Sequence, residues 1–136
     1  EHAKVFDNHY GTSRLALEQA FRDGSGVILE IDWEGARQVR QRVPDCTSIF
    51  ILPPSRAELE HRLRSRRTDS DEVIARRLRD AVSDMSHYDE FDYVIVNDDF
   101  DRAVADLRRI VSGEGADLAR DRPTLAPLLQ DLLAKT

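Results

Sequence analysis

The sequence predicts an α/β fold in which a parallel sheet lies between two layers of helices. Short apolar runs rich in β-branched residues alternate with segments of helical periodicity, and polar turns separate them. The apolar runs are continuous rather than alternating, which is typical of strands buried on both faces. A parallel sheet of such strands needs helices on both sides, so we expect a three-layer α/β/α arrangement.

The first part of the chain is expected to hold an extended segment, two helices and one strand. In chain order these are the extended segment 1–12, a helix at about 13–23, a strand at 27–32 and a helix at about 33–43. Thr12 or Ser13 can cap the first helix, and Gly24 and Gly26 end it. Pro44 ends the second helix.

The rest of the chain is expected to hold two strands and four helices. In order these are a strand at 47–52, helices at about 56–66 and 71–87, a strand at 93–96, a helix at 100–111 and a terminal helix at about 125–134. Ser55, in a capping box with Glu58, begins the first of these helices. Ser70 and Asp99 can cap the next two.

Two of these helices carry apolar residues at helical spacing, which predicts the side that faces the core. The first stripe is Ile74, Leu78, Val82 and Met85, and the second is Phe100, Val104, Leu107 and Val111.

Composition narrows the class of protein. The 136 residues are enough for one domain with a core, and the net charge of −6 argues against non-specific nucleic-acid binding. No apolar run reaches the length of a membrane helix. The single cysteine, Cys46, fits a reducing cytoplasm. The chain opens on Glu1 inside an extended segment, which suggests a fragment, a processed product or a truncated form.

Acidic and amide side chains gather where two predicted strands end. Glu30 and Asp32 close the strand at 27–32 and, two residues apart, would share one of its faces. Asn97 and Asp98 follow the strand at 93–96. Ligands of open α/β sheets bind at this edge, so we expect a ligand site there. The alternative is that these residues cap helices, pair with arginines or form ordinary turns.

Arginines mark two consecutive helices. Arg62 and Arg66 share one helix face, and Arg77 lies on the next helix, so together they could close over phosphates as a lid. The alternative is a solvated face in which these arginines pair with nearby acids. Tyr10 and Thr12 flank a glycine that would let a ligand approach the backbone, which is a weak signal by itself.

These motifs in this order resemble a bacterial guanylate kinase, from residue 1 to about 111. The matching segments are Glu1-His-Ala, Tyr10-Gly-Thr-Ser, Ile28-Leu-Glu-Ile-Asp-Trp-Glu-Gly-Ala, Phe50-Ile-Leu-Pro-Pro-Ser, the Arg62 and Arg66 pair, Ala75-Arg-Arg-Leu and Val94-Ile-Val-Asn-Asp-Asp. The resemblance implies a P-loop-kinase-like fold and transfer of the γ-phosphoryl group of ATP to GMP, with Mg²⁺.

The resemblance also implies a role for each candidate residue. Glu1, Tyr10, Thr12 and Asp32 would bind GMP, Arg62, Arg66 and Arg77 would be the catalytic lid arginines, and Arg62, Arg66, Asn97 and Asp98 would bind ATP. Glu30 stands where the family usually has Asp and would act indirectly on the metal. Residues 1–12 would be the remnant of the GMP-binding region, 13–111 the core domain with a lid at about 62–77, and 112–136 a tail.

One part of the family's pattern is missing from this chain. No G-x-x-x-x-G-K-[ST] loop occurs, nor does the segment with the arginines that grip the GMP phosphate. The strand before that loop would lie between the strands at 27–32 and 47–52. We therefore expect either that this chain is only part of the molecule, or that the gap is closed by re-pairing, by a homo-oligomer or by a second chain. We expect the 136 residues alone to be inactive. The alternative function is a non-catalytic guanylate-kinase-like module that binds proteins.

Overall fold

The computed structural model describes residues 2–5, 8–11, 28–66 and 70–134. The chain divides into two compact units, Glu1–Thr47 and Ser48–Thr136, and each is described by itself. The helix expected at about 13–23 lies outside the described residues.

The first unit holds a hairpin and a helix. Strands β1 (His2–Val5) and β2 (Asn8–Gly11) pair antiparallel, with Ala3 opposite Tyr10. Helix α2 (Trp33–Arg42) packs against β1. Its N-cap is Asp32, whose Oδ1 accepts a hydrogen bond from the amide of Gly35 at 2.9 Å. The extended segment and the second helix were therefore predicted close to their observed places.

The strand predicted at 27–32 is wrong for residues 28–32, which form no regular structure. A strand needs a neighbour that shares its backbone hydrogen bonds, and no described strand pairs with this segment. The apolar run is not buried either, because Ile28 is 74% exposed and Ile31 36%. The argument that Glu30 and Asp32 share a strand face therefore does not apply to this structure.

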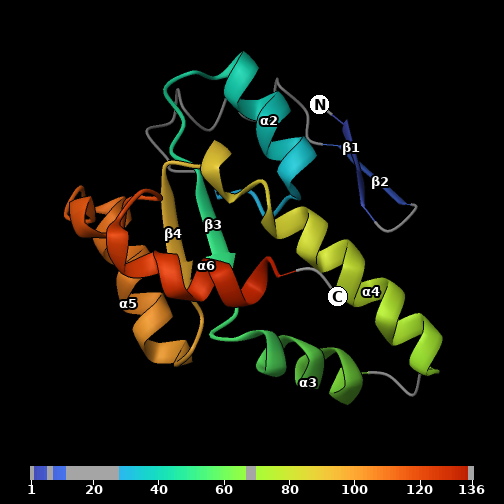
Figure 1. The fold of residues 1–136 in the computed structure, drawn as a ribbon. Helices are drawn as coiled ribbons and strands as arrows, with labels where there is room; N and C mark the ends of the chain where they lie inside the picture. Colours follow the sequence, from blue (N-terminus) through green and yellow to red (C-terminus); the bar gives the residue numbers. More distant parts are fainter. Residues whose placement is uncertain (1, 6–7, 12–27, 67–69, 135–136) are drawn as a thin grey trace. The chain divides into compact units, whose positions relative to one another are not determined.

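The second unit is an α/β unit built on two parallel strands (Figure 1). Strands β3 (Ile49–Leu52) and β4 (Tyr93–Val96) pair with Ile49 opposite Tyr93 and Leu52 opposite Val96. The helices are α3 (Arg56–Arg66), α4 (Asp71–Met85), α5 (Phe100–Val111) and α6 (Ala126–Leu132), with 3₁₀ turns η1 (Tyr88–Glu90), η2 (Ala116–Leu118) and η3 (Pro123–Leu125).

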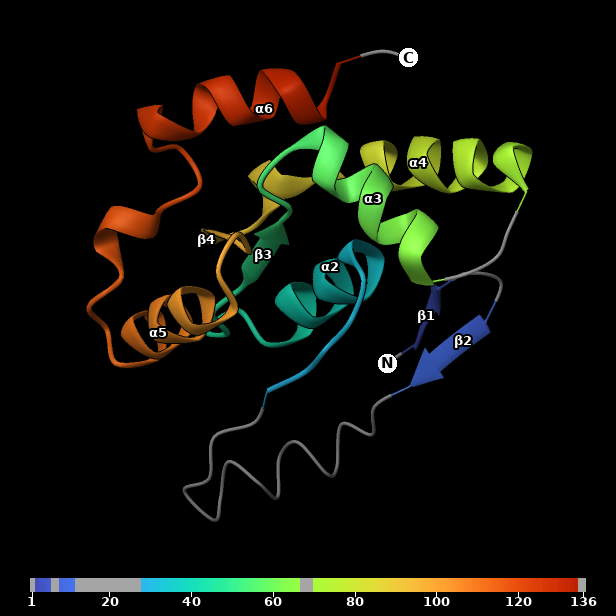
Figure 2. The same ribbon diagram turned by 90° about the horizontal axis from the view of Figure 1, so that it is seen from below.

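Helices cover both faces of these strands, as the sequence predicts. Figure 2 shows β3 and β4 between α6 on one side and α5 on the other. Alternate strand residues explain this arrangement, since successive side chains point to opposite faces. Leu52 and Val94 are buried with Met85 of α4 and Leu132 of α6. Ile95 faces the other way and packs with Ile110 of α5 and Leu118 of η2.

The predicted helix stripes fare differently. On α4, Ile74, Leu78 and Met85 are buried, and Val82 packs on the core, so that stripe is confirmed. On α5 the prediction is wrong for Phe100 and Val111, the two ends of the stripe. Phe100 is 73% exposed and Val111 70%. Leu107 packs on the core as predicted, and the other residues of α5 that do so are Ala103 and the buried Ile110.

The outer edge of β4 is covered by the segment after α5. Ala119 forms an antiparallel bridge with Tyr93, and the amide of Arg120 donates to the carbonyl of Asp92 at 3.2 Å. Arg122 then donates from Nη1 to the carbonyl of Val94 at 2.8 Å. Burial lowers the pKa of the Arg122 guanidinium. A side chain thus satisfies a backbone acceptor that a further strand would otherwise take.

Candidate functional site

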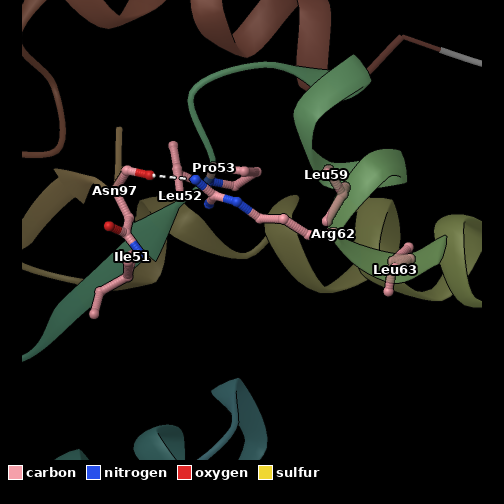
Figure 3. A pocket seen from close by; sticks show the side chains of 7 residues that line it. All are labelled: Ile51, Leu52, Pro53, Leu59, Arg62, Leu63 and Asn97. Carbon is pink, nitrogen blue, oxygen red and sulfur yellow. Dashed lines mark hydrogen bonds between the residues drawn. The ribbon is translucent and has the colours of Figure 1, made fainter. Parts of the chain in front are cut away.

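A pocket of about 220 Å³ opens at the carboxyl end of β3 and β4, which is where ligands of parallel sheets gather. Pro53 ends β3 because proline cannot continue a ladder, and Asn97 follows β4 directly. The residues that line the pocket are Ile51, Leu52, Pro53, Leu59, Arg62, Leu63 and Asn97 (Figure 3).

Arg62 reaches across this pocket from α3. Its Nη2 donates to the backbone carbonyl of Asn97 at 3.0 Å, the contact drawn in Figure 3. Its Nε donates to Oε1 of Glu58, one helical turn earlier, also at 3.0 Å. Ser55 fixes the start of this helix, since its Oγ accepts from the amide of Glu58 at 3.0 Å. The expected alternative, pairing with a nearby acid, is thus confirmed for Arg62 and does not prevent the contact with the strand end.

Asn97 is held by the strand beside it. Its backbone amide donates to the backbone carbonyl of Leu52 at 2.8 Å, which continues the β3–β4 hydrogen bonding past Val96. Asp98 is exposed. Asp99 caps α5 by accepting from the amides of Asp101 and Arg102 at 2.9 and 3.3 Å, as the sequence predicts. The helix-cap alternative is therefore confirmed for Asp99, and a ligand role for Asn97 stays a prediction.

Helices α3 and α4, which carry the predicted lid arginines, pack against each other. Arg64 of α3 donates from Nη1 to Oδ1 of Asp71 at the start of α4, at 2.9 Å. Arg77 is half-buried on α4, one residue before buried Leu78. Arg66 ends α3, and its side chain lies outside the described residues. The structure thus brings Arg62 and Asn97 together, and it gives the backbone positions of the other two arginines.

The residues predicted to bind GMP belong to the first unit. Asp32 is half-buried and caps α2, which was the alternative role expected for it. Tyr10 lies in β2, and its side chain is outside the described residues, as are Glu1 and Thr12 entirely. Glu30 is exposed. Within the described ranges no group of three or more His, Cys, Asp or Glu side chains could hold a metal ion.

The apolar wall of the pocket was not among the predicted site residues. Leu59 and Leu63 are four apart on α3 and so face the same way as each other. Their spacing in the sequence was the available signal, but it cannot distinguish a pocket wall from a core contact. An apolar wall with one guanidinium at its edge suits a flat ring that carries anionic groups.

Across the described part of the chain, no helix has both the length and the apolar character that a membrane crossing requires.

The chain is similar to known proteins of one family. The profile of the guanylate kinase family matches residues 1–114. A guanylate kinase from Alkalilimnicola ehrlichii is 59% identical over 98% of this chain and 66% of its own length. Guanylate kinases from Yersinia pestis and Escherichia coli K12 are each 54% identical over 98% of this chain and 65% of theirs. The chain thus spans about two thirds of the length of these relatives, and it belongs to the guanylate kinase family.

Proposed function

We propose that this protein is an ATP:GMP phosphotransferase of purine nucleotide metabolism. An oxygen of the GMP phosphate attacks the γ-phosphorus of ATP, the bond from that phosphorus to the bridging oxygen breaks, and ADP and GDP result. The observation that supports this most directly is the position of Arg62 at the rim of the strand-end pocket, in a chain of this family.

Arg62 is proposed to stabilise the transferring group. The transition state of phosphoryl transfer spreads negative charge over its oxygens, so a placed cation lowers the barrier. Glu58 and Asn97 engage Nε and Nη2, which leaves Nη1 directed to neither of them. Arg66 and Arg77 are proposed for the same task because they lie on the same pair of helices.

The pocket itself is proposed to receive ATP. Its apolar wall would cover the adenine ring, and Asn97 with exposed Asp98 would line the edge of that ring. In this proposal the base lies beside the strand ends and the phosphates lie towards Arg62.

The first unit is proposed to bind GMP. Glu1 and Asp32 would accept hydrogen bonds from guanine N1 and N2, Thr12 would contact O6, and Tyr10 would bind the phosphate. Asp32 uses Oδ1 to cap α2, and its Oδ2 would accept from the base. A carboxylate that is fixed by a helix start is a well-oriented acceptor.

Mg²⁺ is proposed to arrive with ATP. Magnesium is commonly held by one or two carboxylates together with substrate phosphates, and exposed Glu30 is the carboxylate that fits an indirect role. When bound, the ion would neutralise phosphate charge. We further propose a cytoplasmic location, and a homo-oligomer or second chain beside β3, which pairs only with β4 among the described strands.

A coupled assay of ADP release tests the proposal. The full-length protein should turn over ATP only when GMP is present, whereas the 136 residues alone should not, because they lack a G-x-x-x-x-G-K-[ST] loop. Calorimetric titration with GMP separates the enzyme from a binding module. Peptide binding without GMP binding by the full-length protein would favour the module and overturn the enzyme.

A further inference from the structure

The segment that follows α5 is tied to the first residue of α3. Oδ2 of Asp131, in α6, accepts a hydrogen bond from the amide of Arg56 at 2.8 Å. The guanidinium of Arg56 in turn donates to the carbonyl of Ala134. Arg56 is the first residue of α3, and the first amides of a helix have no acceptor within the helix. Asp131 therefore serves as a cap for α3 from 75 residues away.

Asp131 is itself firmly placed. The next residue, Leu132, has no exposed surface and packs in the cluster that contains Leu52 of β3 and Val94 of β4. Leu125, at the end of the 3₁₀ turn before α6, is buried in the same cluster. The backbone that carries Asp131 is thus anchored to the sheet through the core, and its exposed carboxylate bonds the start of α3.

The contacts continue along α3 to the candidate site. Ser55 accepts from the amide of Glu58, and Glu58 holds the Nε of Arg62. Arg62 then reaches the carbonyl of Asn97. Both ends of this series rest on the β3–β4 sheet, one through Leu132 and the other through Asn97. A displacement of the first turn of α3 would move Glu58, and with it the guanidinium of Arg62.

We propose that Asp131 is a positioning residue that fixes the first turn of α3 and thereby sets the place of Arg62 in the pocket. The effect on nucleotide turnover rests on the proposed kinase function, whereas the effect on α3 does not. A negative charge at a helix N-terminus is also favourable because it meets the positive end of the helix dipole. The carboxylate thus acts through both a hydrogen bond and its charge.

Hydrogen exchange measured by mass spectrometry tests the effect on α3. Asp131→Ala should speed exchange about fivefold in peptides from the start of α3, since that is the usual effect of a lost helix cap. Peptides from α5 should not change. Asp131→Asn keeps an acceptor oxygen and should restore most of the protection. Asp121→Ala, which removes an exposed acid of the same segment, is the matched control and should behave as the wild type.

Steady-state kinetics of the full-length protein test the effect on the site. Asp131→Ala should lower kcat several-fold and raise KM for ATP, because both depend on the place of Arg62, while KM for GMP stays unchanged. Asp131→Asn should restore both values. Unchanged exchange in α3, or equally faster exchange in α3 and α5, would overturn the proposal.

If Asp131→Ala does not fold, Asp131→Asn decides. In that variant the hydrogen-exchange rate should rise about twofold in α3 alone, because the charge is lost. If the wild type phosphorylates no GMP, the kinase function fails while the exchange result still stands.

Discussion

Arg62 and Asn97, 35 residues apart in sequence, are joined by a hydrogen bond of 3.0 Å from the guanidinium to the backbone carbonyl. The bond connects α3, which carries predicted lid residues, to the end of β4. Its acceptor is neutral, and hydrogen bonds from a guanidinium to a charged phosphate are stronger. Under the proposed function, a nucleotide phosphate would replace the carbonyl as the partner of Arg62, whose guanidinium already lies at the pocket.

Replacing Arg62 by alanine should reduce turnover far more than stability. We expect kcat of the full-length protein to fall on the order of a hundredfold, the usual effect of losing one donor to a developing negative charge. The free energy of unfolding should change by less than about 1 kcal/mol, because the pair with Glu58 is partly exposed. The coupled ADP assay and urea unfolding measure the two effects.

Arg64 offers a matched control for this change. It lies two residues along the same helix and pairs with Glu60 and Asp71 at the surface. Arg64→Ala should leave kcat within about twofold of the wild type, since exposed pairs of this kind contribute little. Equal losses of kcat in the two variants would show that the loss follows from removing any positive charge on α3. The specific role given to Arg62 would then be wrong.

Ser48 and Asp92 clamp the beginnings of β3 and β4. The Asp92 carboxylate accepts from the amide and the hydroxyl of Ser48 at 3.0 and 3.2 Å, and the Asp92 amide donates to the Ser48 hydroxyl at 2.9 Å. Asp92→Ala would leave the buried Ser48 amide without this acceptor, so we expect a loss of about 1–3 kcal/mol in urea unfolding. Asp89→Ala, nearby and exposed, should lower the free energy of unfolding much less. If Asp92→Ala loses no more stability than this control, the clamp adds none.

Much of the second unit could be predicted from the sequence because its signals are local. Capping residues at Ser55, Ser70 and Asp99 mark helix starts through their own hydrogen bonds, and all three caps are observed. Helix α5 and strand β4 have the predicted bounds. These features depend on a few neighbouring residues, and the physical chemistry of those residues is unambiguous.

The errors lie where the outcome depends on distant partners. Residues 28–32 have the composition of a strand, but no described strand pairs with them. Phe100 has helical spacing but no apolar cover. The contact between Arg62 and Asn97 was not predicted from the residues, since periodicity cannot show which acceptor a long side chain reaches. The family resemblance implied only that both residues bind ATP. The tie between Asp131 and Arg56 left no signal in the sequence for the same reason.

Leu132 makes the segment after residue 114 part of the fold, although the family profile ends there. Its side chain is fully buried with Leu52 and Val94. Leu132→Ala should lower the free energy of unfolding by about 2–5 kcal/mol, the range for a buried leucine whose cavity does not collapse. Leu133→Ala, next to it and only half-buried, should cost clearly less in the same urea titration. Equal effects would contradict the packing described for α6.

The contact of Asp117 with Arg109 should make stability depend on pH in a defined window. The hydrogen bond from Arg109 lowers the pKa of Asp117 below its ordinary value of 3.8. A carboxyl with a lowered pKa in the folded state stabilises the protein above its ordinary pKa, and this stabilisation is lost as pH falls through the lowered value. Asp117→Asn should therefore be less stable than the wild type at about pH 6, and the difference should disappear as pH falls well below 3.8. Because both groups are exposed, about 1 M salt should shrink the difference; a difference that persists at low pH would contradict this assignment.

Gly113 and Gly115 should respond differently to alanine, although they are two residues apart. A Cβ at Gly115 would lie 2.6 Å from Cγ1 and 3.0 Å from Cα of Ile110, and the backbone atom cannot move aside without shifting the end of α5. We expect Gly115→Ala to cost about 1–3 kcal/mol, as overpacking of a core does. Gly113 has φ +81° and open space around it, so alanine there should cost only the left-handed backbone, about 1–2 kcal/mol. Urea unfolding gives both free energies, and hydrogen exchange at the end of α5 separates the causes, because only Gly115→Ala should speed it. Faster exchange there in Gly113→Ala, with none in Gly115→Ala, would show that the backbone conformation, and not the contact with Ile110, holds η2 against α5.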